Sequence, residues 1–345
     1  MEKTMKSIVF SGIGRYEILE RPVPKIKYPT DVKVKVLAAS ICGSDVHYLA
    51  TPPAMEATEG VILGHECVGE VVECAENVHD LHPGDHVILD NNLTCGVCPM
   101  CQMGLPNLCR NMQSMGSMID GIFAEYFVAP QQQLIKISDK VPIDDAVFAE
   151  PLNTVMGAVK KLKITPGSSV LILGGGPIGL LFSVVLRAAG AGKVLVSEVS
   201  EFRAEYARKS GVDHVINPVK ESLKEKVEEY TNGLGADIVI DAVGVLAPDA
   251  VDCARKGGQC ILFGLNSSKT EVIRQCDITM KGLSVLGSYI GGYALYDVGR
   301  LLEAGKLPLQ QFITHRLPME KFGEGLEALR KGEGLEVVLY PFSNE

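Results

Sequence analysis

The sequence lacks an excess of basic residues. Its 33 lysines and arginines are outnumbered by 42 aspartates and glutamates, so the formal net charge is −9. Nucleic acids and anionic membrane surfaces are bound by basic patches, and we therefore expect neither as a partner. The proportions of charged residues (22%) and hydrophobic residues (46%) are those of an ordinary globular protein.

The sequence also lacks an export signal, a membrane span and a repeat. The opening stretch MEKTMKSIVF has no long apolar core of the kind found in signal peptides. Residues 165–186 carry no charge, but the run Gly-Gly-Gly-Pro at 174–177 interrupts them. A lipid-exposed helix could not satisfy the backbone groups freed at that point. We therefore expect a soluble, cytoplasmic protein.

The 345 residues are more than one hydrophobic core usually serves, which predicts two domains. Up to about Glu150 the pattern is β-rich, with strands expected at 31–40, 66–74 and 83–89. Apolar strands then alternate with helical patterns. The strands are expected at 168–174, 192–198, 236–244, 258–264 and 283–289, and the helices at 177–190 and 200–211. Such alternation predicts an α/β fold with a doubly wound parallel sheet at 154–289, while residues 290–345, with a helix at 294–305, return to the β-rich domain 1–153.

Four cysteines form the most compact motif: Cys95, Cys98, Cys101 and Cys109. Ten cysteines without an export signal imply a reducing compartment, which argues against disulfides. The last gap of the motif is seven residues, unlike the three-residue gap and proline of a bacterial ferredoxin run. The spacing therefore favours tetrahedral zinc thiolate coordination, and because four thiolates leave no open position, we expect a structural zinc in a lobe at about 90–112.

A glycine motif follows the first strand of the parallel sheet. Gly174, Gly176 and Gly179 fit G-x-G-x-x-G, with Pro177 and Ile178 completing the segment. A strand is expected to end just before it and a helix to open at the proline. This context predicts a dinucleotide site, with the pyrophosphate at the helix N-terminus.

Glu198 ends the next predicted strand, where an acidic residue binds the ribose hydroxyls of a dinucleotide. A carboxylate there repels a 2′-phosphate, which favours NAD over NADP. Arg203 follows closely and could soften this preference, although a solvated helix residue is the simpler interpretation.

Three separate segments hold the residue types of a reactive centre. They are ICGSDVH with Cys42, Ser44, Asp45 and His47, GHE with His65 and Glu66, and AEP with Glu150. Each alone has an ordinary explanation, such as a buried cysteine, a core histidine or a turn.

Together with the four-cysteine lobe and the glycine motif, these segments resemble the zinc-dependent medium-chain dehydrogenase/reductase family, in its sorbitol and threonine dehydrogenase branch. The resemblance covers nearly the whole chain and includes 120–130 and 335–342. It implies a β-rich GroES-like catalytic domain, a Rossmann domain, one catalytic and one structural zinc per chain, and a homodimer or homotetramer.

The resemblance also implies roles at the catalytic zinc. Cys42 and His65 match two ligands, and the third is left open between Glu66 and Glu150, since Glu150 stands where the alcohol dehydrogenase branch has a cysteine. Both are oxygen donors suited to zinc. Ser44 matches a hydroxyl that relays the proton, and His47 would pass it outward. Asp45 is expected to orient neighbouring groups rather than to touch the substrate.

The substrate implied is a secondary alcohol of a polyol, cyclitol or sugar-alcohol derivative, oxidised to a ketone with NAD. The alternatives are an L-threonine 3-dehydrogenase, a polyol-phosphate dehydrogenase and a non-catalytic dinucleotide sensor. One departure bears on the choice: sorbitol-type enzymes tend to have Arg-Tyr where this chain has Ser288-Tyr289. The remaining cysteines are expected only to pack: Cys67, Cys74, Cys253, Cys260 and Cys276.

Overall fold

The computed structural model describes residues Lys3–Phe342, so the first two and last three residues of the expected β-rich domain lie outside the described residues. The chain divides into two compact units. The first comprises the chain up to Asn153, Gly292–Gly305 and the chain from Ile313 on, and the second comprises Thr154–Gly291 and Lys306–Phe312. The segment Lys306–Phe312, expected in the first unit, belongs to the second because its 3₁₀ turn packs on a helix there.

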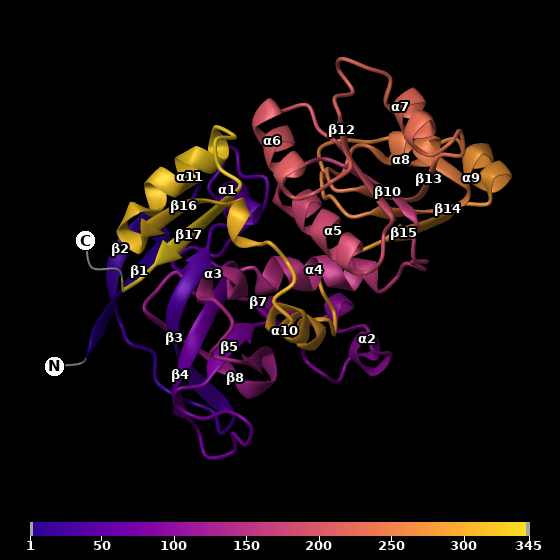
Figure 1. Ribbon diagram of the computed structural model, residues 1–345. Coiled ribbons are helices and arrows are strands. Elements are labelled where there is room, and N and C mark those ends of the chain that lie inside the picture. Colours follow the sequence, from indigo (N-terminus) through magenta and orange to yellow (C-terminus); the bar gives the residue numbers. More distant parts are fainter. Residues whose placement is uncertain (1–2, 343–345) are drawn as a thin grey trace. The chain divides into compact units, whose positions relative to one another are not determined.

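The first unit is built on a seven-stranded, mainly antiparallel sheet (Figure 1). Its order is β16 (Ile313–Pro318), β17 (Glu336–Tyr340), β3 (Asp31–Ser40), β4 (Glu66–Cys74), β5 (His86–Leu89) and β9 (Leu134–Ile137), while β8 (Tyr126–Pro130) also pairs with β3. The strands predicted at 31–40 and 66–74 are confirmed as β3 and β4. Alternate side chains of β3 are fully buried, as the apolar alternation of its sequence requires.

Shorter elements complete the first unit. They are the strands β1 (Thr4–Phe10), β2 (Tyr16–Pro22), β6 (Asn92–Leu93) and β7 (Gln113–Ser114), the helices α1 (Gly43–Tyr48), α2 (Pro99–Gln102), α3 (Ile143–Ala146), α10 (Leu295–Glu303) and α11 (Phe322–Arg330), and the 3₁₀ turns η1 (Pro106–Leu108), η2 (Gln131–Gln133) and η4 (Met319–Lys321). The helix α4 (Ala149–Val159) begins in this unit and ends in the second.

An aromatic pair at the centre of the first unit explains one glycine of the GHE segment. The rings of Phe123 and Phe322 are fully buried, with centroids 5.4 Å apart. Gly64 has φ +85°, and a Cβ there would lie 2.4 Å from the Phe123 ring. Only glycine therefore allows the chain to turn against this core immediately before His65.

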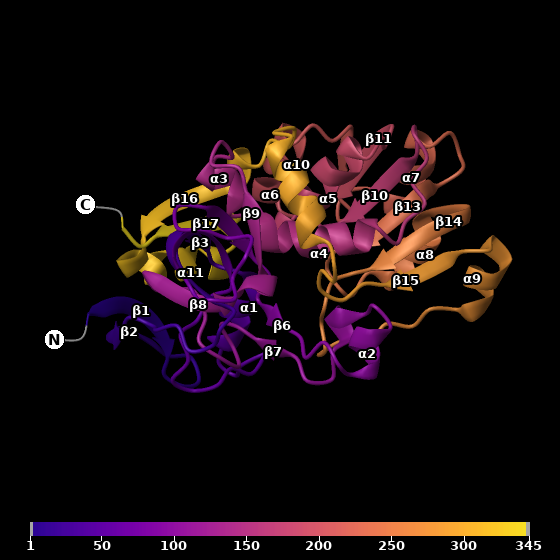
Figure 2. The same ribbon diagram turned by 90° about the horizontal axis from the view of Figure 1, so that it is seen from below.

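The second unit contains a six-stranded parallel sheet. Its order is β12 (His214–Ile216), β11 (Lys193–Ser197), β10 (Ser169–Leu173), β13 (Ala236–Asp241), β14 (Ala254–Leu262) and β15 (Ser284–Gly287). Figure 2 shows β10, β13, β14 and β15 side by side. The order reverses at β10, which defines a doubly wound sheet and puts a ligand crevice at the carboxyl end of that strand.

Helices cover both faces of this parallel sheet. They are α5 (Pro177–Ala188), α6 (Glu201–Lys209), α7 (Leu223–Tyr230), α8 (Ala247–Cys253) and α9 (Gln275–Lys281), and the 3₁₀ turn η3 (Gln310–Phe312) packs on α6. Figure 1 shows α5 and α6 on one side and α7, α8 and α9 on the other. The predicted α/β architecture, a β-rich domain and a doubly wound one, is confirmed.

The uncharged stretch 165–186 contains β10, the glycine turn and most of α5. Among residues 3–342, no helix combines the length and the apolar character needed to cross a membrane.

Four of the five cysteines that were expected only to pack fit that interpretation. Cys67, Cys253 and Cys260 are buried and Cys74 is half-buried. Cys276 is exposed, so the prediction for it is wrong. It lies on α9, a helix with no buried residue among those described.

Candidate metal and dinucleotide sites

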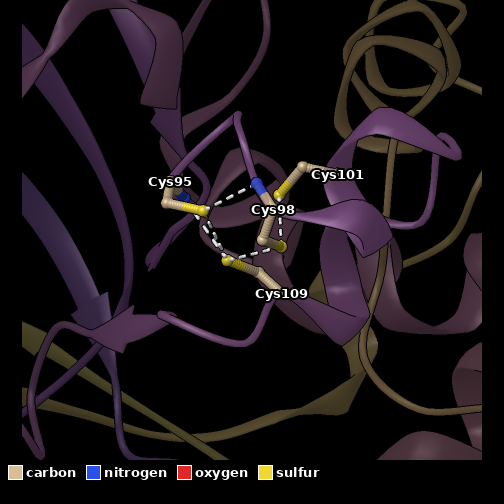
Figure 3. A group of neighbouring side chains, drawn as sticks. All are labelled: Cys95, Cys98, Cys101 and Cys109. Carbon is tan, nitrogen blue, oxygen red and sulfur yellow. Dashed lines mark hydrogen bonds between the residues drawn. The ribbon is translucent and has the colours of Figure 1, made fainter.

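The Sγ atoms of the four lobe cysteines lie within 4.8 Å of one another (Figure 3). The Sγ atoms of Cys98 and Cys101 are 3.6 Å apart, those of Cys98 and Cys109 3.9 Å, and those of Cys95 and Cys109 3.5 Å. A disulfide needs about 2.05 Å between its sulfurs. A zinc–sulfur distance of about 2.3 Å in a tetrahedron gives sulfur separations of about 3.8 Å. The lobe therefore has the dimensions of a four-thiolate zinc site.

Backbone amides of the lobe point at its sulfurs. The N–H of Cys98 donates to Cys95 Sγ at 3.4 Å, and the N–H groups of Cys95 and Asn111 donate to Cys109 Sγ at 3.3 and 3.4 Å. Backbone donors, first that of Cys101, lower the pKa of Cys98 to about 6. Such donors stabilise thiolates, the form in which cysteine binds a metal.

A second group of donors lies in the first unit: Cys42, His65 and Glu66. Their candidate ligand atoms all lie within 4.8 Å of one another, and His65 and Glu66 are buried. The topology explains the grouping. Glu66 opens β4 directly opposite Ser40, the last residue of β3, so the turn that carries Cys42 starts beside the GHE segment.

Glu150 is buried in the first turn of α4 and contributes charge to this group. Burial, followed by the charges of Glu66 and Asp90, raises the pKa of Glu150 to about 8, although His65 opposes this rise. Within the described chain, Glu150 is not a member of the three-residue donor group. The geometry thus distinguishes two carboxylates that the sequence left equivalent.

Asp45, expected to orient neighbouring groups, is fully buried close to His65 and Glu66. Its Oδ2 accepts the Cys42 N–H at 2.9 Å, which holds the turn carrying the thiol. Burial raises the pKa of Asp45 to about 6, with His65 opposing the rise. Burial tends to lower the pKa of His65, but the carboxylates of Asp45, Glu66 and Glu150 raise it above its ordinary value.

Ser44 and His47 both lie on α1 but differ in exposure. The Ser44 Oγ is buried and has no geometrically complete hydrogen bond among the described residues. It lies close enough to the Cys42 thiol and the Tyr48 hydroxyl to lower the pKa of each slightly against the larger effect of burial. His47 is exposed. A buried hydroxyl beside the donors and an imidazole in solvent thus occur one helical turn apart.

In the second unit, the predicted boundaries of the glycine motif are confirmed: β10 ends at Leu173 and α5 begins at Pro177. Gly174 has φ +102°, and a Cβ on Gly179 would lie 1.9 Å from the Gly174 carbonyl oxygen. The turn therefore requires glycine at both positions. Gly176 precedes α5 without a side-chain cap, so the N–H groups of its first turn are available to an anion.

Glu198 lies beside the glycine turn and is 5% exposed. Its Oε2 accepts the Gly175 N–H and its Oε1 accepts the Ser200 N–H, both at 2.7 Å. The carboxylate is thereby fixed against the turn, and each oxygen keeps a lone pair for a further donor. Arg203, in the first turn of α6, is half-buried and donates its backbone N–H to Ser200 Oγ at 3.5 Å.

Two family models match the chain. Residues 28–139 match the family described as "Alcohol dehydrogenase GroES-like domain", and residues 177–304 match the family described as "Zinc-binding dehydrogenase". The first match covers the segments of both metal-donor groups up to the end of β9, and the second begins at the first residue of α5.

Known proteins match over almost the full length. L-threonine 3-dehydrogenase of Pyrococcus horikoshii is 38% identical over 333 residues, which cover 93% of this chain and 94% of that protein. D-xylulose reductase A of Aspergillus oryzae is 31% identical over 345 residues, with 96% of each chain covered. A solved structure of a Sinorhizobium meliloti 1021 protein bound to NADP has a TM-score of 0.93 and 31% identity, covering 99% of this chain and 100% of that one.

Proposed function

The chain belongs to the zinc-dependent medium-chain dehydrogenase/reductase family, and we propose that it oxidises a secondary alcohol of a polyol, cyclitol or sugar-alcohol derivative to a ketone, with NAD as hydride acceptor. Membership makes it an oxidoreductase of the zinc-containing alcohol dehydrogenase type. The observation that carries the substrate proposal is the Cys42–His65–Glu66 donor group enclosed by further carboxylates.

The negative charges around this donor group favour the binding of a divalent cation. Burial and the carboxylates of Glu66, Asp45 and Glu150 raise the pKa of Cys42 well above its ordinary value. A cation held there relieves this accumulation of buried acid and favours the thiolate. A thiolate, an imidazole and a carboxylate are zinc ligands, and three protein ligands leave a fourth position for substrate.

We assign direct ligation to Cys42, His65 and Glu66, and leave Glu150 as a nearby carboxylate. Zinc supplies a Lewis acid that polarises an alcohol oxygen, and NAD supplies the hydride acceptor. Asp45 holds the Cys42 turn through its hydrogen bond to the backbone. A second zinc, bound by Cys95, Cys98, Cys101 and Cys109, is structural because its coordination is closed.

We assign the proton relay to Ser44, with His47 as the outward acceptor. The Ser44 hydroxyl is buried and lacks a complete hydrogen bond, so a substrate hydroxyl can supply the missing partner. Oxidation of an alcohol releases its hydroxyl proton, and a buried site needs a group that carries it to solvent. The exposure of His47 suits the last step of that transfer.

The acidic surroundings of the donor group support an uncharged substrate. The charges with the largest effect on the pKa of Cys42 are the carboxylates of Glu66, Asp45 and Glu150, and the same three carboxylates act on His65. They repel an anionic substrate and accept hydrogen bonds from hydroxyl groups. An uncharged polyol or cyclitol therefore fits better than a substrate with its own carboxylate or phosphate.

Threonine is the second candidate, favoured by the 38% identity to the Pyrococcus L-threonine 3-dehydrogenase. Its reacting hydroxyl is also that of a secondary alcohol. Its carboxylate must then be bound by a basic residue outside the charged groups described above.

The deciding experiment is NAD reduction by zinc-replete protein across polyols, cyclitols, polyol phosphates, L-threonine and primary alcohols. Each rate is compared with that of the Cys42→Ser variant, which reports any background activity. The expected result is the highest kcat/KM on an uncharged polyol or cyclitol. A higher kcat/KM on threonine or a primary alcohol than on every polyol would overturn the substrate proposal.

We further propose a cytoplasmic homodimer or homotetramer, without nucleic-acid or membrane partners. Size-exclusion chromatography with light scattering measures the oligomeric state. A monomer at micromolar concentration would contradict the proposed homodimer or homotetramer.

A further inference from the structure

A helix near the C-terminus holds the end of the short helix that carries His47. The helix α11 packs against α1 within the first unit (Figure 1). Arg330 is the last residue of α11, and its Nη2 donates a hydrogen bond to the carbonyl oxygen of Leu49 at 2.6 Å. Leu49 directly follows α1 and lies 281 positions before Arg330 in the sequence. The end of α1 is therefore bound by a distant part of the chain.

The carbonyl of Leu49 needs a partner of this kind. A helix leaves its last carbonyl groups without partners inside the helix, and a buried carbonyl without a hydrogen bond is costly. Leu49 is 1% exposed, so the arginine takes the place of water at this end. With only six residues, α1 is also too short to be stable without contacts to the rest of the unit.

The two ends of α1 are held by different parts of the first unit. At its beginning, the Asp45 carboxylate accepts the Cys42 N–H at 2.9 Å. At its other end, the Arg330 guanidinium binds the Leu49 carbonyl. The proposed metal ligand Cys42 thus lies at the end fixed by Asp45, whereas the exposed His47 lies at the end fixed by Arg330.

Arg330 is itself held in place on α11. Its Nη1 donates to Glu327 Oε1 at 2.8 Å, one turn earlier on the same helix, while its Nη2 binds Leu49. The helix is anchored in the core through Phe322 and Leu326, which are buried. The Arg330 side chain is 34% exposed, so solvent screens its charge. The contribution of Arg330 is therefore mainly the fixed direction of its planar donor group.

We propose that Arg330 is a positioning residue for proton release: acting through the Leu49 carbonyl, it holds the end of α1 so that His47 can accept the substrate proton and pass it to solvent. This inference rests on the proton relay of the proposed function. Transfer of a proton requires hydrogen-bond contact between the groups, so a small displacement of the acceptor slows it strongly.

The test is the rate of the first turnover, measured by stopped-flow absorbance of NADH. The probe is the alcohol with the highest kcat/KM in the panel described above. Arg330→Met removes the donor and keeps an apolar stem of similar length. We expect it to slow the first turnover by about tenfold, a part of the factor of about 10² to 10⁴ that positioned proton transfer contributes. Rising HEPES concentration at constant pH and ionic strength should restore most of the rate, because the buffer base replaces the displaced imidazole.

Companion variants separate positioning from a general effect on the fold. Arg330→Lys keeps a donor for the single hydrogen bond to Leu49 and should retain a nearly normal rate. Lys331→Leu removes an exposed positive charge from the next residue and is the matched control, which should change neither the rate nor its response to HEPES. His47→Ala should lose rate and regain it with HEPES. Adding Arg330→Met to it should cost little more, because both changes act on one transfer step.

The outcomes distinguish this inference from the function on which it rests. A normal first turnover in Arg330→Met, or a loss that HEPES does not restore while it does restore His47→Ala, overturns the positioning role alone. A normal first turnover in His47→Ala overturns the proposed relay and this inference with it. Oxidation of no alcohol in the panel overturns the proposed function together with this inference.

Discussion

Cys42 and His65 each have an ordinary explanation when their sequence segments are taken alone, and their convergence with Glu66 makes them candidate metal donors. Cys42→Ser and His65→Ala should therefore each reduce zinc from two atoms to one per chain and reduce activity to background, with the fold retained. Metal analysis by mass spectrometry, circular dichroism and NAD reduction measure the three quantities.

Cys276→Ser, at an exposed cysteine outside both donor groups, is the matched control and should change none of them. Substantial turnover in a Cys42→Ser protein shown to hold a single zinc would contradict the assignment of the catalytic site.

Glu198 has a similarly direct test. Its carboxylate is fixed beside the glycine turn by two backbone N–H groups and carries the charge that would repel a 2′-phosphate. Glu198→Gln removes the charge and preserves most of the shape, so the ratio of kcat/KM with NAD to that with NADP should fall by about tenfold, or about 1.4 kcal/mol.

Glu198→Ala should also lower the ratio of kcat/KM with NAD to that with NADP. It should in addition weaken dinucleotide binding, because the Gly175 and Ser200 N–H groups lose their acceptor. If the unmutated protein prefers NADP, Glu198 does not determine the preference between NAD and NADP. The Sinorhizobium neighbour was solved with NADP, which makes this comparison informative.

At the residue scale, sequence reasoning could identify the side chains that belong to short motifs. Cys42, His65 and the four lobe cysteines were identified because their chemistry is visible in a few adjacent letters. The hydrogen bond from the Ser40 hydroxyl to Glu66 could not be identified in this way. It depends on the pairing of β3 with β4 and on the register that places Ser40 opposite Glu66.

Among the elements, the four-cysteine lobe has little secondary structure of its own. Between β6 and β7 it comprises the four-residue helix α2, the three-residue turn η1 and loops. Its stability should therefore depend on the metal. Cys98→Ser should lower the Tm: a loss of about 2 kcal/mol in a unit of this size corresponds to about 4–8 °C.

Because the lobe has no open coordination position, activity per folded molecule of Cys98→Ser should change much less than its Tm. Differential scanning calorimetry and active-site titration separate the two effects. Unchanged Tm together with abolished turnover would place chemistry in the lobe and refute its structural role.

The parallel sheet has a charged connection at the amino ends of its central strands. Asp237 on β13 accepts hydrogen bonds from the Ser169 N–H and Oγ on β10, both at 2.7 Å, and from Arg255 Nε on β14 at 2.6 Å. Burial alone would raise the pKa of Asp237, but these donors outweigh it and lower the pKa below its ordinary value.

A carboxylate with a depressed pKa stabilises the fold above the pKa of the unfolded chain, and this stabilisation is lost as pH falls through the folded pKa. Asp237→Asn should thus cost about 1 to 2 kcal/mol near pH 7, since hydrogen bonds to a charged group are removed. The difference from unmutated protein should shrink as pH falls below about 4.

Urea unfolding at several pH values measures the Asp237 effect, and Asp252→Asn, at an exposed aspartate of the same unit, is the control. A difference that stays constant from pH 7 to pH 3 would show that the charge of Asp237 contributes nothing.

Element boundaries were most predictable where local signals agree. β3 and β4 match their predicted ranges, and α5 begins at Pro177, where proline suits the first helical position. The helix α1 was not predicted. It has six residues, too few for a periodic apolar pattern, and it is held by contacts of the turn around Asp45.

On the scale of the whole molecule, the two kinds of site are divided between two units. All candidate metal donors belong to the first unit, while the glycine turn and Glu198 belong to the second. The sequence indicated this division because β-rich and alternating patterns differ over long stretches. It could not show that residues 306–312 return to the second unit, since that depends on the packing of η3 against α6.

This division predicts that NADH binding survives removal of the catalytic zinc. A chelator should remove the ion held by Cys42, His65 and Glu66 before the ion of the closed four-thiolate lobe, because an open position admits a competing ligand. Protein with one zinc remaining should be inactive. It should still bind NADH with a Kd within about twofold of the untreated value, a difference of about 0.4 kcal/mol. Saturating NADH should also raise its Tm, since a ligand that binds only the folded state stabilises it.

NADH fluorescence titration, thermal unfolding and metal analysis on the same sample test this prediction. The matched control is Glu198→Ala protein, which should keep both zinc atoms and bind NADH more weakly. Loss of NADH binding together with the catalytic zinc would show that the dinucleotide site is not formed by the second unit alone.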